Sequence, residues 1–256
     1  MRRIIDLTHD IVTGMPVYPG DPEVEISPFM IHEKDYCHVD SMHIGSHTGT
    51  HIDAPFHFLD AGKRITDFPV SYFIGSGVII DLRTKEENTP ITISDLSAYT
   101  DLMNKADFCI LMTGWDRCWG SAAYERHPYL DPQAARLLVD CGIRIVATDG
   151  LNIDSTVTEE FDSHPILLGA ETLIVENLTN AEALWDENAS GAMLMPGTFS
   201  FVPLKLDSSD GSPIRAYYYE YRASSLCLIT DAGNYKSPLT SLPWYLLIPP
   251  IFVMFT

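Results

Sequence analysis

Three histidines and an aspartate stand close together between residues 46 and 58, and these residue types are suited to metal chemistry. The segment reads His47-Thr-Gly-Thr-His51-Ile-Asp53-Ala-Pro-Phe-His57. Imidazole and carboxylate groups are ligands of zinc and of related first-row divalent ions. A chance cluster of solvated polar residues would be expected to include Lys and Glu, and this segment contains neither. The segment therefore predicts a divalent-metal site.

The spacing of these groups limits the structure that can bring them together. Metal–ligand bonds of about 2.0–2.2 Å require the ligand groups to crowd around one point. A straight strand, rising about 3.3 Å per residue, would separate His47 from His57 by more than about 30 Å. A regular helix would bring His47 and His51 together but would turn Asp53 away. We therefore expect a bent segment, with His51 and Asp53 on one face of a short extended stretch and His57 beyond the proline, better placed for proton transfer.

Short runs rich in apolar or β-branched residues predict strands at Arg3–Leu7, Gly77–Leu82, Phe108–Met112, Ile143–Ala147, Leu173–Val175, Phe199–Leu206 and Ile214–Arg222. The four runs from Gly77 to Val175 are continuous and lie beside Gly or Asp residues, so we expect these strands to be buried on both faces. The acidic spacer Asp207–Gly211 ends in glycine and predicts a hairpin between the last two strands.

One helix is clearly indicated, and shorter helical turns accompany it. Asp131 can cap the helix, Pro132 fits its first turn, and Gly142 ends it. The shorter turns are expected at Ser94–Thr100, His164–Ala170 and Asn180–Trp185. Strands therefore dominate, and we expect a strand-rich α/β domain that could close into a barrel.

The overall composition favours a single soluble domain. The chain has 256 residues, which one large domain can accommodate. It carries a formal charge of −19, which keeps a protein in solution and repels nucleic-acid phosphates, so nucleic acid is not an expected partner. The five cysteines form no Cys-x-x-Cys pair, as is typical of a reducing compartment. The first residues lack the apolar stretch of a signal peptide, so we expect a cytoplasmic protein.

The C-terminal run Trp244–Thr256 is almost wholly apolar. It is shorter than the roughly 20 residues that span a bilayer, and Pro249-Pro250 would break a helix. We expect this run to pack on the core or on a partner subunit, and we do not expect stable membrane insertion.

The segment His47–His57 resembles the signature of the metal-dependent cyclase family, which includes bacterial-type kynurenine formamidases and isatin hydrolases. Other segments resemble the family in the same order along the chain, so the resemblance covers about residues 3–222. These segments are Tyr18–Pro22, Thr113–Trp115, Ala147–Asp149 with Asp154, His164–Leu168, Ile174–Leu178, Phe201–Lys205 and Asp210–Arg215. We expect a cyclase-like domain over residues 1–222, followed by an atypical tail over residues 223–256.

The resemblance implies a role for each residue of the site. His47, His51 and Asp53 would bind one metal, and Asp53 would bridge to a second. The resemblance also implies a swivelling β/β/α barrel, a homo-oligomer such as a dimer or tetramer, and zinc or manganese as one or two ions per chain. The remaining assignments are His164 and Glu176 as ligands of the second metal, His57 as the catalytic acid/base, and Tyr18 and Trp115 as substrate-binding residues.

Each of these residues also has a simpler interpretation. Without the resemblance, His164 beside Pro165 is a turn residue, and Glu176 is a solvated carboxylate at the end of a strand. Tyr18 and Trp115 are as well explained by packing in the core. These alternatives stay open at the level of the sequence.

The predicted activity is the metal-assisted hydrolysis of an amide, lactam or lactone bond in a small molecule, and aromatic molecules are among the candidates. A bound divalent ion lowers the pKa of water towards about 7, and a histidine beside it can donate a proton to the leaving group. The alternatives are a ring-forming cyclase that runs the reverse reaction and a non-enzymatic metal-binding or small-ligand-binding protein. A serine hydrolase is disfavoured, because Gly75-Ser76-Gly77 lacks the spacing of a nucleophile elbow.

Overall fold

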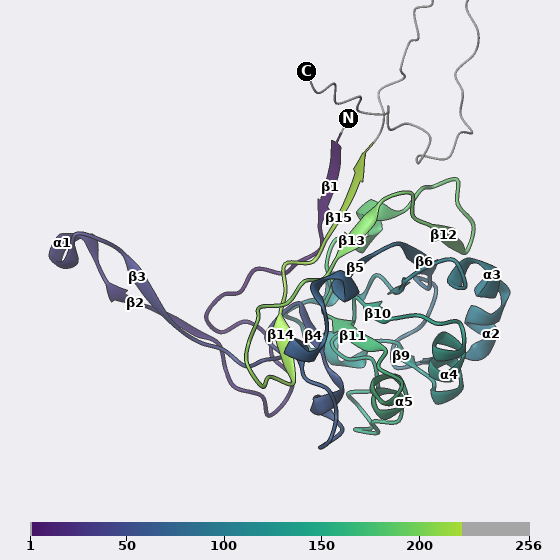
Figure 1. The fold of residues 1–256 in the computed structure, drawn as a ribbon, viewed down its shortest axis with the longest axis horizontal. Helices are drawn as coiled ribbons and strands as arrows, with labels where there is room; N and C mark the ends of the chain where they lie inside the picture. The colour runs from purple at the N-terminus through teal and green to yellow at the C-terminus, as the bar shows by residue number, and fades with distance from the viewer. Residues whose placement is uncertain (1, 222–256) are drawn as a thin grey trace, which may run out of the picture.

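A seven-stranded sheet forms the centre of the computed structural model, which describes residues 2–221 (Figure 1). The predicted tail over residues 223–256 lies outside the described residues. Four strands of the sheet are parallel, namely β6 (Gly77–Asp81), β8 (Phe108–Met112), β10 (Ile145–Thr148) and β11 (Leu173–Glu176). Three antiparallel strands complete it, namely β12 (Ala192–Leu194) beside β6, β4 (His51–Asp53) beside β11, and β14 (Gly211–Pro213) beside β4.

The parallel strands are apolar on both faces because the sheet is covered on both sides. Ile79 and Ile110 pack in one buried cluster, whereas their neighbours Val78 and Leu111 pack in another. Alternate side chains of a strand point to opposite faces, so each cluster marks one face of the sheet. The continuous apolar runs in the sequence predicted this arrangement.

A four-stranded sheet covers the first face. Its order is β1 (Arg2–Asp6), β15 (Tyr217–Tyr221), β13 (Thr198–Ser200) and β5 (Ile74–Gly75). Ile5, Phe199 and Tyr218 from this sheet enter the same cluster as Ile79. The first and last described strands thus lie side by side.

Helices cover the second face. They are α2 (Ile93–Leu96), α3 (Thr100–Met103), α4 (Pro132–Asp140) and α5 (Ser163–Gly169). Asp131 caps α4 by accepting a hydrogen bond from the Gln133 backbone N–H at 2.8 Å, so the predicted start of this helix is confirmed. Leu138 and Leu167 pack with Val78 beneath these helices.

Short elements complete the described chain. β7 (Pro90–Ile91) and β9 (Tyr129–Leu130) form a small parallel pair. The 3-10 helices are η1 (Pro55–His57), η2 (Ile65–Asp67), η3 (Val70–Phe73), η4 (Ser97–Tyr99), η5 (Trp115–Cys118), η6 (Tyr124–Arg126) and η7 (Ala181–Leu184).

An arm projects from the body of the molecule (Figure 1). It is built from β2 (Glu25–Met30) and β3 (Val39–His43), which pair antiparallel, and α1 (His32–Asp35) lies at its tip. Neither strand has a buried residue. The sequence did not predict this arm, because its strands have no buried face that would produce an apolar pattern.

The strand-rich α/β class is confirmed, but a closed barrel is not. The pairing order of the larger sheet runs from β12 to β14, and within the described part of the chain these two edge strands do not pair with each other. The predicted hairpin is more complex than expected. Ser200 in β13 does pair with Tyr217 in β15, but β14 between them joins the other sheet. In the described range, no helix combines the length and the apolar character needed to cross a bilayer.

Candidate metal centre

Strand β4 places two of the predicted ligands at the centre of the site. His51 and Asp53 are alternate residues of this strand, so they project from the same face. Glu176 in β11 pairs directly with His51 across the sheet, and Gly211 in β14 pairs with Asp53. The His51 and Asp53 side chains are 4% and 1% exposed, so two polar groups stand where the interior would otherwise be apolar.

The chain bends on both sides of β4, as the spacing of the ligands predicted. Gly49 has a φ of +62°, and this left-handed turn brings His47 back against the strand. The Nδ1 atom of His47 lies 2.7 Å from Asp53 Oδ1. Beyond the strand, Pro55 starts η1 and carries His57 to the same place, with its ring centroid 4.0 Å from that of His47.

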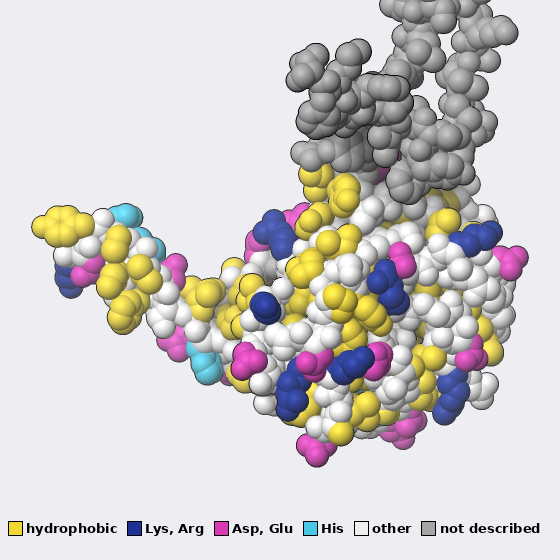
Figure 2. Space-filling model, in the orientation of Figure 1, with side chains coloured by type: hydrophobic (Ala, Val, Ile, Leu, Met, Phe, Trp, Pro, Cys, Tyr) yellow, Lys and Arg dark blue, Asp and Glu magenta, His cyan; other side chains and the backbone are white. Residues whose placement is uncertain are grey.

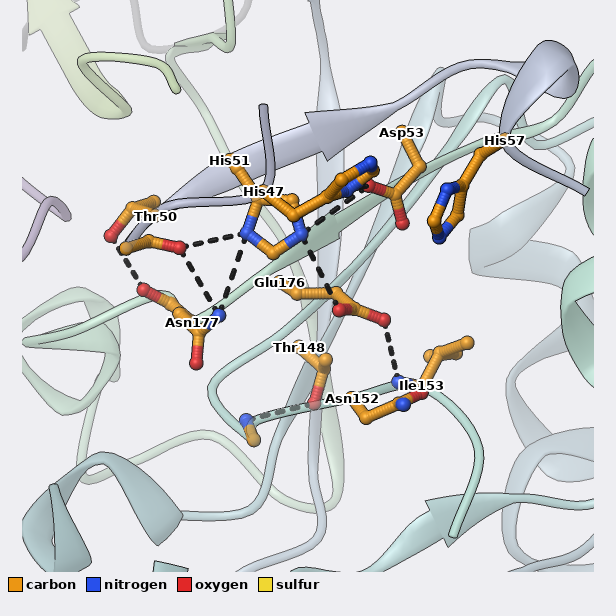
Figure 3. Close-up of polar contacts among 12 residues, drawn as sticks. His47, Thr50, His51, Asp53, His57, Thr148, Asn152, Ile153, Glu176 and Asn177 are labelled. Atoms are coloured by element: carbon orange, nitrogen blue, oxygen red, sulfur yellow. Dashed lines mark hydrogen bonds and ion pairs between the residues drawn. The ribbon is translucent and has the colours of Figure 1, made fainter. Parts of the chain in front are cut away.

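His164 and Glu176 complete the group, although they lie more than a hundred residues further along the chain. His164 comes from α5 and its Nε2 atom lies 3.7 Å from Asp53 Oδ2 and 3.5 Å from Glu176 Oε1. The Nε2 atom of His51 lies 3.3 Å from Asp53 Oδ1 and 3.5 Å from Glu176 Oε2. Figure 3 shows His47, His51 and His57 around Asp53, with Glu176 beneath them. The structure thus brings together the six predicted metal and acid/base residues.

The three ligand-type histidines share one feature. Each has one ring nitrogen that faces the carboxylate of Asp53, and the other nitrogen is held by an acceptor. For His51 that acceptor is the Gly49 carbonyl, at 2.8 Å from Nδ1 (Figure 3). For His164 it is Asp154, at 2.7 Å from Nδ1, and for His47 it is Asp210, at 3.0 Å from Nε2. Metal-binding histidines are oriented in this way in proteins.

Asp53 has one buried oxygen that lacks a hydrogen-bond partner, namely Oδ2. Burying a carboxylate oxygen without a hydrogen-bond donor destabilises the folded protein. A cation in contact with Oδ2 would remove this cost. Potential ligand atoms of His47, Asp53 and His57 lie within 4.8 Å of one another, and so do those of His51, Asp53 and Glu176. Asp53 belongs to both sets, so the donors fit a divalent-metal site centred on this carboxylate.

The electrostatics of the donors also favour positive charge. Burial opposes protonation of His47, but Asp53 and Asp210 outweigh it and raise the pKa of His47 to about 10. Burial likewise opposes the charge on Asp53, but His47 and His51 hold the pKa of this carboxyl well below its usual range. The carboxylates therefore attract protons onto the imidazoles when no other cation is present. A divalent ion would compete with those protons.

A cleft of about 190 Å³ opens beside the donors. His57, with its side chain 29% exposed, lies on its wall. The aromatic residues Tyr18, Phe58 and Phe161 line it, and the Phe58 ring stacks on that of His164 at 4.4 Å between centroids. An aromatic molecule could therefore lie against these rings while it reaches the donors.

The two predicted substrate-binding residues lie in different places. Tyr18 lines the cleft, whereas Trp115 is not among the lining residues. The Trp115 indole N–H instead donates to the Ala123 carbonyl at 3.1 Å. A role for Trp115 in substrate binding stays a prediction.

Four residues of the site received no role from the sequence. Phe58 and Phe161 resemble ordinary core aromatics, although Phe58 is the neighbour of His57. Asp154 and Asp210 occur within the segments of family resemblance, but nothing in their spacing indicates contact with a particular histidine. Folding brings them there, because Asp154 also accepts the Ser163 and His164 backbone N–H groups at the start of α5.

Comparisons with known proteins show which family and which relatives this chain resembles. The Cyclase family model, described as "Putative cyclase", matches residues 5–155. A kynurenine formamidase from Geobacillus thermodenitrificans is 30% identical over 224 residues, which cover 84% of this chain and 97% of that protein.

Solved structures show the same fold. Isatin hydrolase A from Labrenzia aggregata superimposes with a TM-score of 0.74 at 22% identity, over 85% of this chain and 93% of that one. A predicted metal-dependent hydrolase from Bacillus stearothermophilus has a TM-score of 0.64 at 26% identity, over 86% of this chain and 98% of that one. The first likeness is one of fold, because its sequence identity is low.

Proposed function

This chain belongs to the cyclase family, and from that premise we propose that it is a metal-dependent hydrolase of a small aromatic amide, with an arylformamide as its substrate. One observation carries the proposal. The inward-facing nitrogens of His47, His51 and His164 meet the carboxylates of Asp53 and Glu176, and Asp53 Oδ2 has no other partner. The name of the Geobacillus relative supports the class of substrate.

The donor set fits one or two divalent ions, and zinc or manganese is the proposed metal. Neutral imidazoles and carboxylates bind both, and first-row ions share these ligands. His47 and His51 with Asp53 would hold one ion, and His164 and Glu176 with Asp53 would hold the other. When bound, such an ion supplies Lewis acidity that polarises a carbonyl group and lets water ionise near neutral pH.

The remaining residues act on the substrate. Phe58, Phe161 and Tyr18 would hold the aromatic ring, so that the amide carbon faces the donors. Hydrolysis forms a bond from a water oxygen to that carbon and breaks its bond to nitrogen. The leaving nitrogen needs a proton, and His57 on the cleft wall is placed to donate it. The same groups would serve ring closure in the reverse direction.

The geometry favours an enzyme over a protein that only stores or binds metal. A structural metal site is closed by its ligands, whereas a catalytic site keeps an open side for substrate. Here the cleft reaches His47, His51 and His164, and His57 stands beside them.

Compartment and assembly are part of the same proposal. An odd number of cysteines without a Cys-x-x-Cys pair supports the cytoplasm. Self-association is supported by the arm, on which Phe29 and Tyr36 are 70% and 98% exposed. Figure 2 shows hydrophobic side chains on the surface of this arm. An isolated two-stranded hairpin is marginally stable in water, so a second copy would stabilise it.

Formate release from formanilide tests the activity. We expect the metal-loaded protein to release formate and aniline together, and Asp53→Asn to abolish the reaction. Asp60→Asn, which removes the same charge from an exposed position nearby, should keep the wild-type rate. Wild-type turnover by Asp53→Asn would refute the proposed site.

A further inference from the structure

Asp210 lies next to the metal donors because of strand pairing. It directly precedes β14, whose first residue, Gly211, pairs with Asp53. The Asp210 carbonyl accepts the Ala54 N–H at 2.8 Å, so the backbone holds this residue beside the end of β4. Its position is thus set by the same sheet that positions Asp53.

One carboxylate oxygen of Asp210 serves two histidines. Oδ2 accepts from His47 Nε2 at 3.0 Å and from His57 Nδ1 at 3.3 Å. The Ser46 side chain also hydrogen-bonds this carboxylate. The carboxylate is 33% exposed and the His47 ring 13% exposed, so this carboxylate sits where the site meets the cleft.

The backbone beside Asp210 packs closely against one side of the His47 ring. A Cβ atom on Gly211 would lie 2.7 Å from His47 Cε1, closer than real Cβ contacts. The His57 ring packs against the His47 ring, with 4.0 Å between the two ring centroids. His47 is therefore confined by Gly211 on one side, and its remaining freedom is limited by the hydrogen bond to Asp210.

We propose that Asp210 is a positioning residue that sets two functions at once, the direction of the His47 ligand nitrogen and the direction of the His57 proton. With Nε2 of His47 on Asp210, Nδ1 is the nitrogen that faces Asp53. With Nδ1 of His57 on Asp210, Nε2 is left to exchange a proton with substrate in the cleft. The part of this inference that concerns His57 rests on the proposed function. The part that concerns His47, its His47 half, concerns metal binding alone.

The test compares Asp210→Asn with Asp207→Asn, which removes an equal charge from an exposed position on the same loop. Metal affinity is measured by competition with a chromophoric chelator, and the cobalt-substituted proteins are compared by their visible spectra. Loss of a residue that orients a metal-binding histidine typically costs about 10–100-fold. We therefore expect Asp210→Asn to bind the same number of ions with about 10–100-fold weaker affinity and an altered cobalt spectrum. Asp207→Asn should match the wild type in both.

Kinetics at saturating metal test the His57 half. Asp210→Asn should lower kcat for formanilide by about 10–100-fold while KM stays within about threefold. In a His57→Gln background the same substitution should lower kcat further by less than about twofold, because the two residues act as a unit. A thermal melt equal to that of the wild type confirms that the variant is folded.

Three results would overturn the inference. The first is wild-type metal affinity and wild-type kcat in Asp210→Asn. The second is the loss of one bound ion at saturating metal in this variant, which would make Asp210 a direct ligand. The third is an additive effect on kcat when Asp210→Asn is combined with His57→Gln. If the wild type binds metal but hydrolyses no arylformamide, the proposed function fails, and the chelator competition still decides the His47 half.

Discussion

At the scale of single residues, Asp53 explains why the site needs a cation. Among the described residues it is the buried carboxylate with an oxygen, Oδ2, that has no hydrogen-bond partner, although the Nε2 atom of His164 lies 3.7 Å away. Histidines flank both of its oxygens, and their outer nitrogens are already occupied by Gly49, Asp154 and Asp210. Protons on the imidazoles are the alternative to a metal, so metal binding should release protons.

His57 gives the first prediction at this scale. His57→Gln removes the titrating group but keeps a donor for Asp210. The rate should fall by about 10²–10⁴-fold, as for loss of a general acid, while elemental analysis finds unchanged metal. Potential ligand atoms of His57, His47 and Asp53 lie within 4.8 Å of one another. Loss of an ion from this variant would therefore identify His57 as a metal ligand.

Asp149 gives a prediction about stability and pH. It is buried and accepts hydrogen bonds from the backbone N–H groups of Thr113 and Gly114. Burial raises its pKa from 3.8 to about 6. Because the pKa is higher in the folded state than in the unfolded state, the protonated carboxyl stabilises the fold. This stabilisation is complete below pH 3.8 and is lost as the pH rises through about 6.

The check is urea unfolding of chelated wild type and Asp149→Asn between pH 4 and pH 7. The free energy of unfolding of the wild type, relative to the variant, should fall by about 3 kcal/mol over this range, at about 1.4 kcal/mol per pKa unit. A difference that stays constant with pH would show that the carboxyl titrates normally.

At the scale of elements, sequence patterns predicted the parts of the fold that depend on burial. The Phe108–Met112 run became β8 with the same bounds, and Asp131 caps α4 as expected. Both follow from local rules, since apolar runs form buried strands and Asp accepts a free N–H at a helix start. The bend through His47–His57 was predictable because no regular element could gather its ligands.

Other elements depend on contacts that no local pattern records. β14 contains only Gly211, Ser212 and Pro213, and its sequence does not show that it leaves one sheet for the other. The contacts of Asp154 and Asp210 with histidines likewise arise when distant segments meet. His164 and Glu176 were assigned through the family resemblance, because their spacing alone suggests a turn and a strand end.

The arm gives the prediction at the scale of elements. Phe29, Tyr36 and Met42 are 70%, 98% and 65% exposed. Replacing all three with Ser should turn an oligomer into a monomer in size-exclusion chromatography with light scattering, with little change in the melting temperature of the body. Val70→Ser with Leu204→Ser, at positions 64% and 55% exposed away from the arm, is the control. A wild-type monomer at micromolar concentration would contradict the proposed self-association.

At the scale of the whole molecule, negative charge extends from the surface into the cleft. The chain carries a formal charge of −19, and the residues that line the cleft include Asp21 and Glu176 but no Lys or Arg. Among the described residues that line the cleft, a substrate carboxylate would therefore meet no Lys or Arg side chain.

This charge predicts selectivity among arylformamides. Neutral formanilide should have a kcat/KM about tenfold higher than an analogue with a carboxylate on its ring, which corresponds to about 1.4 kcal/mol. The ratio should shrink at high salt and in Asp21→Asn, but not in Asp207→Asn. A preference for the anionic analogue would contradict the predicted selectivity.

Elemental analysis of the active protein, paired with its rate on an arylformamide, tests metal-dependent hydrolysis at the Asp53 centre most directly. We expect one or two zinc or manganese ions per chain, a rate that falls in step with metal removed by chelator, and recovery when metal is restored. A metal-free sample that hydrolyses the arylformamide at the full rate would contradict the account.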